Sequence, residues 1–234
     1  MRALIVFATL IVPATSLASD CVILLHGLAR TSSSMEKMQE ALEAAGYHVV
    51  NESYPSREHP IEELAPMAID AGIENCREAG SGERINFVTH SLGGILVRYY
   101  MEHGELDEIG RVVMMGPPNQ GSAAVDAMGN LPGFDALNGP AGRQLGTDEN
   151  SIPLSLGAPE FEFGVIAGNR TIDPVTSAVL KNPDDGKVSV EDTKLEGMAD
   201  FALVPVSHAY IMKDAEVIKL VKQFLEEGNF KAAW

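Results

Sequence analysis

The sequence predicts an α/β fold, in which a mostly parallel sheet of about six strands is flanked by helices. Two observations predict it. Continuous apolar runs, such as residues 21–25 and 85–88, are typical of strands buried on both faces of a parallel sheet. Helical repeats of apolar residues follow such runs, as in residues 92–99. Alternation of the two patterns along one chain indicates βαβ units.

The expected strands lie at residues 21–25, 47–52, 85–88, 111–115, 161–167 and 201–206. Ser33 and Glu36 have the spacing of a capping box, so a helix is expected to start there. A further helical pattern follows Pro60, and because Pro66 interrupts it, the main helix is expected to begin at Pro66. Asp214 is expected to cap the closing helix.

Length and charge limit the classes of function. The chain has 234 residues, of which 45% are hydrophobic, enough for one domain with a sizeable core. Its formal net charge is −16. A strongly acidic protein is repelled by nucleic acid and by anionic membrane surfaces, so neither is expected as a partner.

The amino terminus has the pattern of a secretory signal peptide. Arg2 precedes an apolar run at residues 3–12, which is too short to span a bilayer. Ser16 and Ala18 then supply the small residues that signal peptidase reads. We therefore expect residues 1–18 to be removed and residues 19–234 to form a single secreted or periplasmic domain. The alternative is a buried amino-terminal strand.

The chain has two cysteines, Cys21 and Cys76. Cys21 opens the first expected strand, and Cys76 ends the helix before the next central strand. In a βαβ unit the helix runs antiparallel to the strand, so its end returns to the level of the strand's start. We therefore expect a Cys21–Cys76 disulfide, which an exported protein can keep. The alternative is two buried free thiols.

Residues 87–94, Phe-Val-Thr-His-Ser-Leu-Gly-Gly, carry the strongest chemical signal. An apolar strand meets Ser91, and a helical pattern begins at the next residue. A strand, a sharp turn and a helix place a serine hydroxyl on an exposed corner. Gly93 and Gly94 allow the helix to press against the strand end. The free N–H groups at the helix start, that of Leu92 among them, can stabilise an oxyanion.

Two further segments are expected at the same edge of the sheet. Gly27 follows the first strand, so the amide of Leu28 is a second candidate oxyanion donor, while His26 is expected to be structural. Residues 123–159 are rich in glycine, proline and leucine without a clean period, which indicates a short cap over the site. Four of its side chains are expected to line an acyl pocket or to hold the cap on the core: Leu131, Phe134, Leu137 and Leu145.

A serine nucleophile needs a base within hydrogen-bond reach, usually a histidine because its pKa lies near neutrality. His208 directly follows the last expected strand and is the candidate. His90 adjoins Ser91 in sequence, but its side chain is expected to point away from it. A carboxylate then orients the imidazole. The candidate carboxylates are Asp173, Asp184 and Asp185.

Together these motifs resemble the bacterial lipase and esterase branch of the α/β-hydrolase superfamily. The resemblance covers nearly all of residues 19–234: the His-Gly turn, the serine elbow, the Gly-Pro-Pro-Asn-Gln-Gly-Ser segment, the acid turn and the terminal histidine. The departure is Thr89, which stands where the Gly-x-Ser-x-Gly pattern of the superfamily has its first glycine.

The resemblance implies an α/β-hydrolase fold and a triad in the chain order serine, acid, histidine. The three residues are then Ser91, Asp185 and His208. Asp185 is favoured over Asp184 because Asp-Gly-Lys-Val-Ser resembles the acid turn of this group. The implied activity is hydrolysis of a small-molecule or lipid carboxylic ester through an acyl-enzyme, without a cofactor.

Two other interpretations stay open. The same triad could serve an amidase, a thioesterase or an acyltransferase, and an inactive hydrolase fold could bind a lipid or a protein. The six histidines are scattered without the spacing of a metal site, so no metal is expected. The sequence leaves open the acyl-chain length, the alcohol and the oligomeric state.

Overall fold

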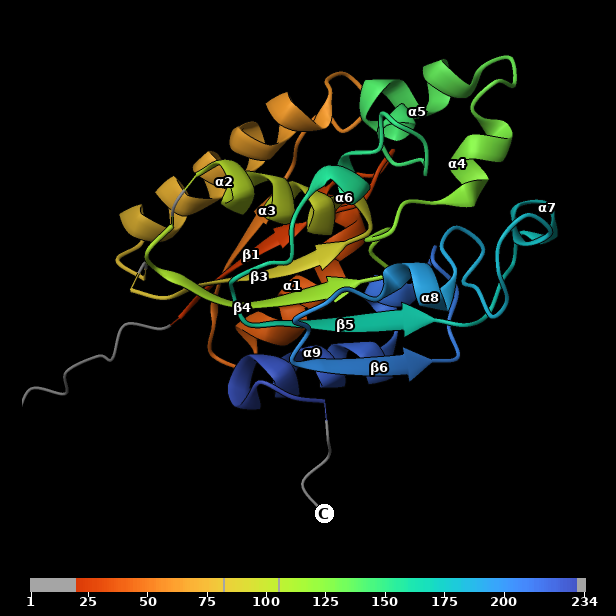
Figure 1. Ribbon diagram of the computed structural model, residues 1–234. Coiled ribbons are helices and arrows are strands. Elements are labelled where there is room, and N and C mark those ends of the chain that lie inside the picture. The colour runs from red at the N-terminus through yellow and green to blue at the C-terminus, as the bar shows by residue number, and fades with distance from the viewer. Residues whose placement is uncertain (1–19, 82, 105, 231–234) are drawn as a thin grey trace, which may run out of the picture.

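A computed structural model of the chain describes residues 20–81, 83–104 and 106–230. The expected signal peptide, residues 1–18, lies outside the described residues. The strands are β1 (Cys21–Leu25), β2 (His48–Glu52), β3 (Ile85–His90), β4 (Ile109–Met115), β5 (Phe163–Gly168) and β6 (Asp200–Val204). They form one six-stranded sheet in the order β2-β1-β3-β4-β5-β6, and each neighbouring pair is parallel (Figure 1). The predicted strands are confirmed, with small shifts at their ends.

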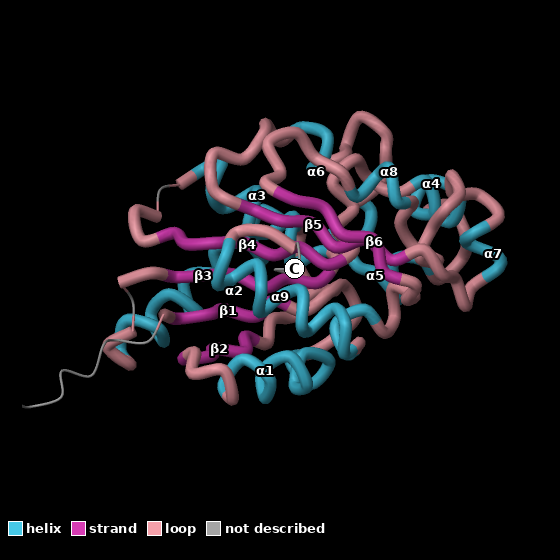
Figure 2. Tube along the Cα trace, turned by 90° about the horizontal axis from the view of Figure 1, so that it is seen from below, coloured by secondary structure: helices cyan, strands magenta, loops and turns pink. Residues whose placement is uncertain are grey.

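Helices cover both faces of this sheet. The longer ones are α1 (Glu36–Glu43), α2 (Ile61–Glu78), α3 (Leu92–His103) and α9 (Ala215–Glu227). The shorter ones are α4 (Ala123–Met128), α5 (Phe134–Arg143), α6 (Ile152–Ser155), α7 (Pro174–Ser177) and α8 (Val190–Thr193). The helices α2 and α3 lie on one face, and α1 and α9 lie on the other (Figures 1 and 2).

The alternation of side chains along the strands builds two apolar cores. All five residues of β1 are fully buried. Ile23 and Leu25 point into the core beneath α2 and α3, whereas Val22 and Leu24 point into the core that α1 and α9 cover. The central strands are therefore buried on both faces, which explains why their sequences are apolar without a break.

The order of the strands fixes where a ligand site can lie. The chain passes from β1 to β2 on one side, and then crosses to β3 on the other side of β1. Connections leave the carboxyl ends of β1 and β3 in opposite directions, and such a switch point opens a crevice in which α/β proteins bind ligands. Leu28 follows β1 and Ser91 follows β3, so both lie at this crevice.

Two details of the helices were predicted wrongly. The helix α2 begins at Ile61 and runs through Pro66, which costs one backbone hydrogen bond. Its first turns are nonetheless fixed, because Ile61 and Leu64 are fully buried and the Ile61 amide donates to Gln144 Oε1 at 2.8 Å. Ser33 does not cap a helix: it lies inside a 3-10 turn before α1, and its hydroxyl bonds that of Thr31 at 2.8 Å.

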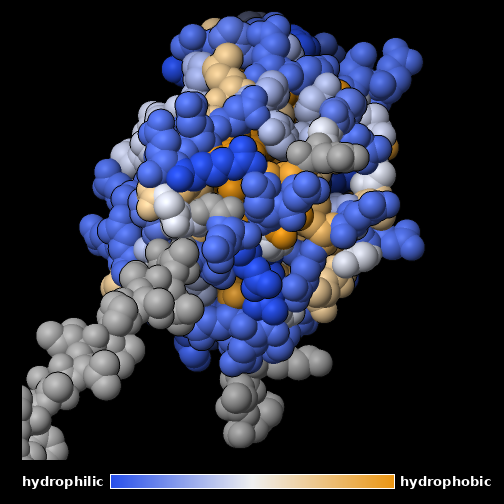
Figure 3. Space-filling view, turned by 90° about the vertical axis from the view of Figure 1, so that its left-hand side faces the viewer, coloured by the Kyte–Doolittle hydropathy of each residue, from blue (hydrophilic) through white to orange (hydrophobic). Residues whose placement is uncertain are grey.

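The face at the amino ends of the strands is dominated by hydrophilic side chains (Figure 3). Such a surface agrees with the formal net charge of −16. Within residues 20–81, 83–104 and 106–230, no helix combines the length and the apolar character needed to cross a bilayer.

A disulfide joins Cys21, at the start of β1, to Cys76, in the last turn of α2. Both cysteines are fully buried. The bond therefore ties the amino end of β1, opposite to the switch point, to the covering helix α2.

Replacing both cysteines with alanine should lower the free energy of unfolding by about 4 kcal/mol, because the unfolded chain loses a cross-link between residues separated by 55 positions. Urea unfolding of the oxidised protein and of the variant measures the difference. Dithiothreitol should lower the urea midpoint of the wild type and leave that of the variant unchanged. A wild-type urea midpoint that dithiothreitol leaves unchanged would contradict the prediction.

Candidate active site

Ser91 lies on a strained turn between β3 and α3. It is the N-cap residue of α3, with φ 52° and ψ −117°, and it is 8% exposed. A side chain in this region of φ costs conformational energy, which the surrounding contacts must offset. The Ser91 amide donates to the carbonyl of Met115 at 2.9 Å, so the end of β4 holds the turn in place.

Small residues make room for this turn. A Cβ on Gly93 would lie 2.7 Å from the carbonyl oxygen of Leu25, so only glycine lets α3 start against the end of β1. A Cβ on Gly94 would lie 3.3 Å from Thr89 Oγ1. Thr89 itself is fully buried, and its hydroxyl donates to the Val113 carbonyl at 3.3 Å. The threonine fits at the first position of the elbow because the space it needs is left free by Gly94.

His208 and Asp185 are in direct contact. His208 Nδ1 lies 2.7 Å from Asp185 Oδ2, and the side chains are 11% and 1% exposed. The other carboxylate oxygen accepts from the amides of Lys187 and Val188, at 2.9 and 2.8 Å. The His208 amide also donates to the Asp185 carbonyl at 3.0 Å. These bonds fix the Asp185 carboxylate, which in turn holds the His208 imidazole with its Nδ1 toward the carboxylate.

The two other candidate acids lie elsewhere. Asp184 Oδ1 accepts from the Gly186 amide at 2.8 Å, and Oδ2 accepts from the Ser177 hydroxyl at 2.7 Å. Asp173 caps α7 and forms an ion pair with Lys187 at 3.1 Å. Neither contacts His208, so Asp185 is the carboxylate that the structure places beside the imidazole.

The loop after β1 is held by the loop after β2. The His26 and Tyr54 rings stack with centroids 4.1 Å apart, and the Tyr54 hydroxyl donates to the His26 carbonyl. Burial lowers the pKa of His26, which fits the structural role expected for it. Ala29 has φ 55°, and its amide donates to Ser56 Oγ at 3.1 Å. These contacts fix the backbone around Leu28, and no local sequence pattern indicated Tyr54 or Ser56.

His90 lies at the site, contrary to the expectation that it would point away from Ser91. Its Nε2 donates to the His208 carbonyl at 3.1 Å, and the two rings lie with centroids 4.8 Å apart. A Cβ on Gly27 would lie 2.6 Å from His90 Nδ1 and 3.2 Å from Ser91 Cβ. The expectation failed because it considered the strand alone, and the loops after β1 and β6 close around this side chain.

One cavity of about 420 Å³ joins these groups. Ser91, His90, His208 and Leu28 line it, together with α4 and α5. All four cap residues expected at an acyl pocket line it: Leu131, Phe134, Leu137 and Leu145. Leu131 and Leu137 are 58% and 65% exposed, whereas Phe134 and Leu145 are buried. Both expected roles therefore occur, since Leu145 also belongs to the core beneath α2 and α3 and so holds the cap on it.

A second cavity, of about 550 Å³, lies by the carboxyl end of α3 and contains none of these groups.

Ser91 and His208 share the cavity without a direct bond. Of the described hydrogen bonds of His208, two join it to Asp185 and one to His90, and none joins it to Ser91. Contacts between a nucleophile and its base are often long in a free enzyme and shorten when substrate binds.

A buried arginine supports the loop after β4. Arg98, on α3, donates to the backbone carbonyl and the side-chain oxygen of Asn119, at 3.1 and 3.2 Å. Asn119 in turn donates to the Thr193 carbonyl at 2.8 Å. Burial lowers the pKa of the Arg98 guanidinium to about 10. The network links α3 to the segment that begins at Gly116, where a Cβ would lie 3.1 Å from both Asp185 Oδ2 and His208 Nδ1.

In the described part of the chain, no group of three or more histidine, cysteine or acidic side chains could hold a metal ion.

The stability of the fold should fall as the pH drops below about 6.5, the ordinary pKa of histidine. Burial, and then the charges of His208 and Arg30, lower the pKa of His90 well below that value. The unfolded chain therefore binds a proton that the folded chain does not, which favours unfolding at acid pH.

Urea midpoints at pH 9, 8, 7, 6 and 5 measure this loss for the wild type and for His90→Phe. The loss from pH 7 to 5 should be smaller in the variant, which has no imidazole at position 90. Between pH 8 and 9 the difference between the urea midpoints of the two proteins should stay constant, because His90 is neutral in both the folded and the unfolded chain. Urea midpoints of the wild type and the variant that change in parallel from pH 9 to 5 would contradict the prediction.

Solved structures of lipases are similar to this chain. For Bacillus licheniformis lipase BlEst2 the TM-score is 0.73 in the propeptide form and 0.70 in the mature form, at 19% and 18% sequence identity. Both matches cover 92% of this chain, with 52% of the propeptide form and 95% of the mature form. The chain thus spans about half the length of the propeptide form.

Aspergillus fumigatus lipase B gives a TM-score of 0.65 at 13% identity, over 92% of this chain and 55% of that one. At these identities the neighbours establish the α/β-hydrolase fold and nothing finer. No curated protein matches the sequence. The profile of the family described as palmitoyl protein thioesterase matches residues 21–151, more than half of the chain. The chain therefore belongs to the palmitoyl protein thioesterase family.

Proposed function

We propose that the protein hydrolyses carboxylic acyl esters through a covalent acyl-enzyme on Ser91. The observation that carries the proposal is the 2.7 Å contact between His208 Nδ1 and Asp185 Oδ2, beside a cavity that His208 and Ser91 both line. The lipase-like fold and the family membership support the general class of hydrolase.

In the proposed reaction, Ser91 Oγ attacks the carbonyl carbon while its proton passes to His208 Nε2. Asp185 holds Nδ1 and stabilises the imidazolium that forms. The tetrahedral intermediate collapses, the bond to the leaving group breaks, and His208 protonates that group. Water then attacks the acyl-enzyme by the same route, which releases the acid and restores the serine.

The amides of Leu28 and Leu92 are the proposed donors to the oxyanion. Leu92 is the first residue of α3, so its N–H has no partner within the helix. Leu28 lies in the loop that Tyr54 and Ser56 hold in place, and it lines the cavity. Fixed donors aimed at a developing charge are worth several kcal/mol in the transition state.

A second candidate activity is hydrolysis of acyl thioesters, which the family match favours. The same attack, oxyanion and acyl-enzyme serve both substrates, and the two differ in the leaving thiol or alcohol. We further propose that the protein is exported, as its amino-terminal sequence predicts. The Cys21–Cys76 disulfide supports this location, because disulfides persist in oxidising compartments.

Ser91→Ala should lower kcat for a chromogenic butanoate ester by about 10⁴-fold or more, because the nucleophile is lost. Asp185→Asn should lower it by roughly 10⁴-fold, because the imidazole loses its orienting carboxylate. An organophosphonate should label the wild type at Ser91, as peptide mass spectrometry would report.

Asp184→Asn is the matched control. Its side chain bonds Ser177 and Gly186 rather than His208, so kcat should stay within a few-fold of the wild type. Full activity in Ser91→Ala would show that another residue is the nucleophile. A folded wild type that neither turns over the ester nor reacts with the phosphonate would make the protein a binding module.

Esters and thioesters of matched acyl chains from two to sixteen carbons distinguish the two activities. Because the cap side of the cavity is apolar, kcat/KM should rise by about fourfold for each buried methylene and then level off when the cavity is full. A preference of tenfold or more for the thioester over the matched ester would favour the second candidate. A profile that is flat from two carbons upward would exclude the cavity as the acyl site.

A further inference from the structure

The charges around the cavity differ from those of the whole protein. The chain has 33 acidic and 17 basic residues, counting lysine and arginine. No carboxylate is among the residues that line the cavity, whereas Arg30 and Lys187 both are. The charged side chains that line the cavity are therefore basic, in a strongly acidic protein.

Arg30 supplies most of this charge. It is half-buried, and in the described part of the chain its guanidinium has neither an ion pair nor a hydrogen bond. Lys187 is half-exposed and already pairs with Asp173 at 3.1 Å. The charge of Arg30 also reaches the site, since it is one of the causes that lower the pKa of His90.

The backbone holds Arg30 close to the proposed oxyanion donor. Arg30 comes two residues after Leu28, and Ala29 between them is fixed at φ 55° by its bond to Ser56. A guanidinium without a partner at the wall of a cavity keeps its N–H donors free. An anion on the bound substrate would accept from them in charge-assisted hydrogen bonds.

The lining of the cavity favours an anion on the leaving group rather than on the acyl chain. The part of the cavity formed by residues 124–137 is lined by apolar side chains, which suit a hydrocarbon. Two acids of the cap have other partners: Asp126 accepts from Thr147, and Asp135 pairs with Arg143. The charged wall comes instead from the loop after β1 and from the turn at Lys187.

We propose that the site prefers acyl esters or thioesters whose leaving group carries a phosphate or carboxylate, which the Arg30 guanidinium binds. This inference rests on the proposed hydrolase function, and it names the class of leaving group that the function would act on.

Three butanoate esters test the preference. One releases 4-hydroxybenzoate, one releases its neutral methyl ester, and one releases 4-hydroxyphenyl phosphate. The measurement is the ratio of kcat/KM for each anionic ester to that for the neutral ester, in the wild type and in Arg30→Gln, at fixed low ionic strength. Comparing ratios between proteins cancels the intrinsic reactivities of the three esters.

The ratio should fall by about tenfold in Arg30→Gln, as expected for the loss of a charge-assisted contact. Arg30→Lys should retain part of the preference for the anionic esters, because a lysine keeps the charge but not the planar guanidinium. Added salt should lower the ratio in the wild type and have less effect in Arg30→Gln. A larger fall for the phosphate than for the carboxylate ester would identify phosphate as the favoured group, and the reverse would identify carboxylate.

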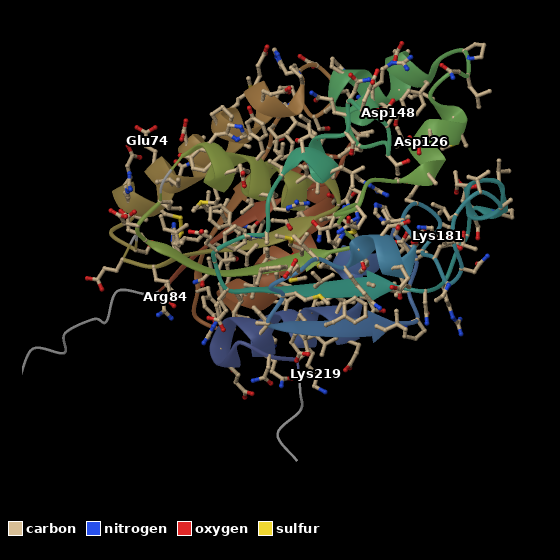
Figure 4. The ribbon with its side chains drawn as sticks, viewed as in Figure 1. Glu74, Arg84, Asp126, Asp148, Lys181 and Lys219 are labelled. Carbon is tan, nitrogen blue, oxygen red and sulfur yellow. A yellow bond between two sulfur atoms is a disulfide. The ribbon has the colours of Figure 1, made fainter. Side chains whose placement is uncertain are left out.

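Arg84→Gln is the matched control. Arg84 is exposed, and it lies at the opposite end of the sheet from Lys181 and the cap residue Asp126 (Figure 4). The substitution changes the net charge by the same amount, so it should leave the ratio unchanged if the effect of Arg30 is local.

Equal losses on all three esters in Arg30→Gln, or an unchanged ratio, would overturn the preference and leave the proposed hydrolase intact. An equal fall of the ratio in Arg84→Gln would also overturn it, because the effect would then come from net charge. A wild type that hydrolyses none of the three esters would overturn both proposals.

Discussion

The turns at the carboxyl ends of β1, β3 and β4 pack so tightly against their neighbours that glycines stand at the closest contacts. A Cβ on Gly27 would lie 2.6 Å from His90, and one on Gly93 would lie 2.7 Å from the Leu25 carbonyl. One on Gly116 would lie 3.1 Å from both Asp185 and His208. This close packing lets residues from distant parts of the chain meet at one small cavity.

Contacts behind the cavity stabilise that approach. Tyr54 and Ser56 hold the loop after β1, and Arg98 holds the loop after β4 through Asn119. The helices α4 and α5, with the segment between them, add the apolar wall. The reacting groups and the groups that would bind the substrate are thus supplied by loops, while the sheet provides a fixed edge for all of them.

Much of this arrangement could be predicted from local sequence, because strands buried on both faces need apolar runs and a serine elbow needs small neighbours. Local sequence left three candidate acids open, and only the resemblance of the Asp-Gly-Lys-Val-Ser turn to a known acid turn favoured Asp185, which lies 2.7 Å from His208. Pro66 and His90 were misjudged because tertiary packing decided each: buried side chains let α2 continue through the proline, and the loops after β1 and β6 enclose the histidine. Tyr54 and Ser56 act across the fold and leave no periodic signal.

The threonine at position 89 shows that the elbow needs a certain free volume rather than a glycine at a particular place. A Cβ at position 94 would lie 3.3 Å from Thr89 Oγ1, so side chains at the two positions compete for the same space. The two positions should therefore covary among related chains, with a bulkier residue at one accompanied by glycine at the other. A search pattern that demands glycine at the first position alone would pass over hydrolases built in this way.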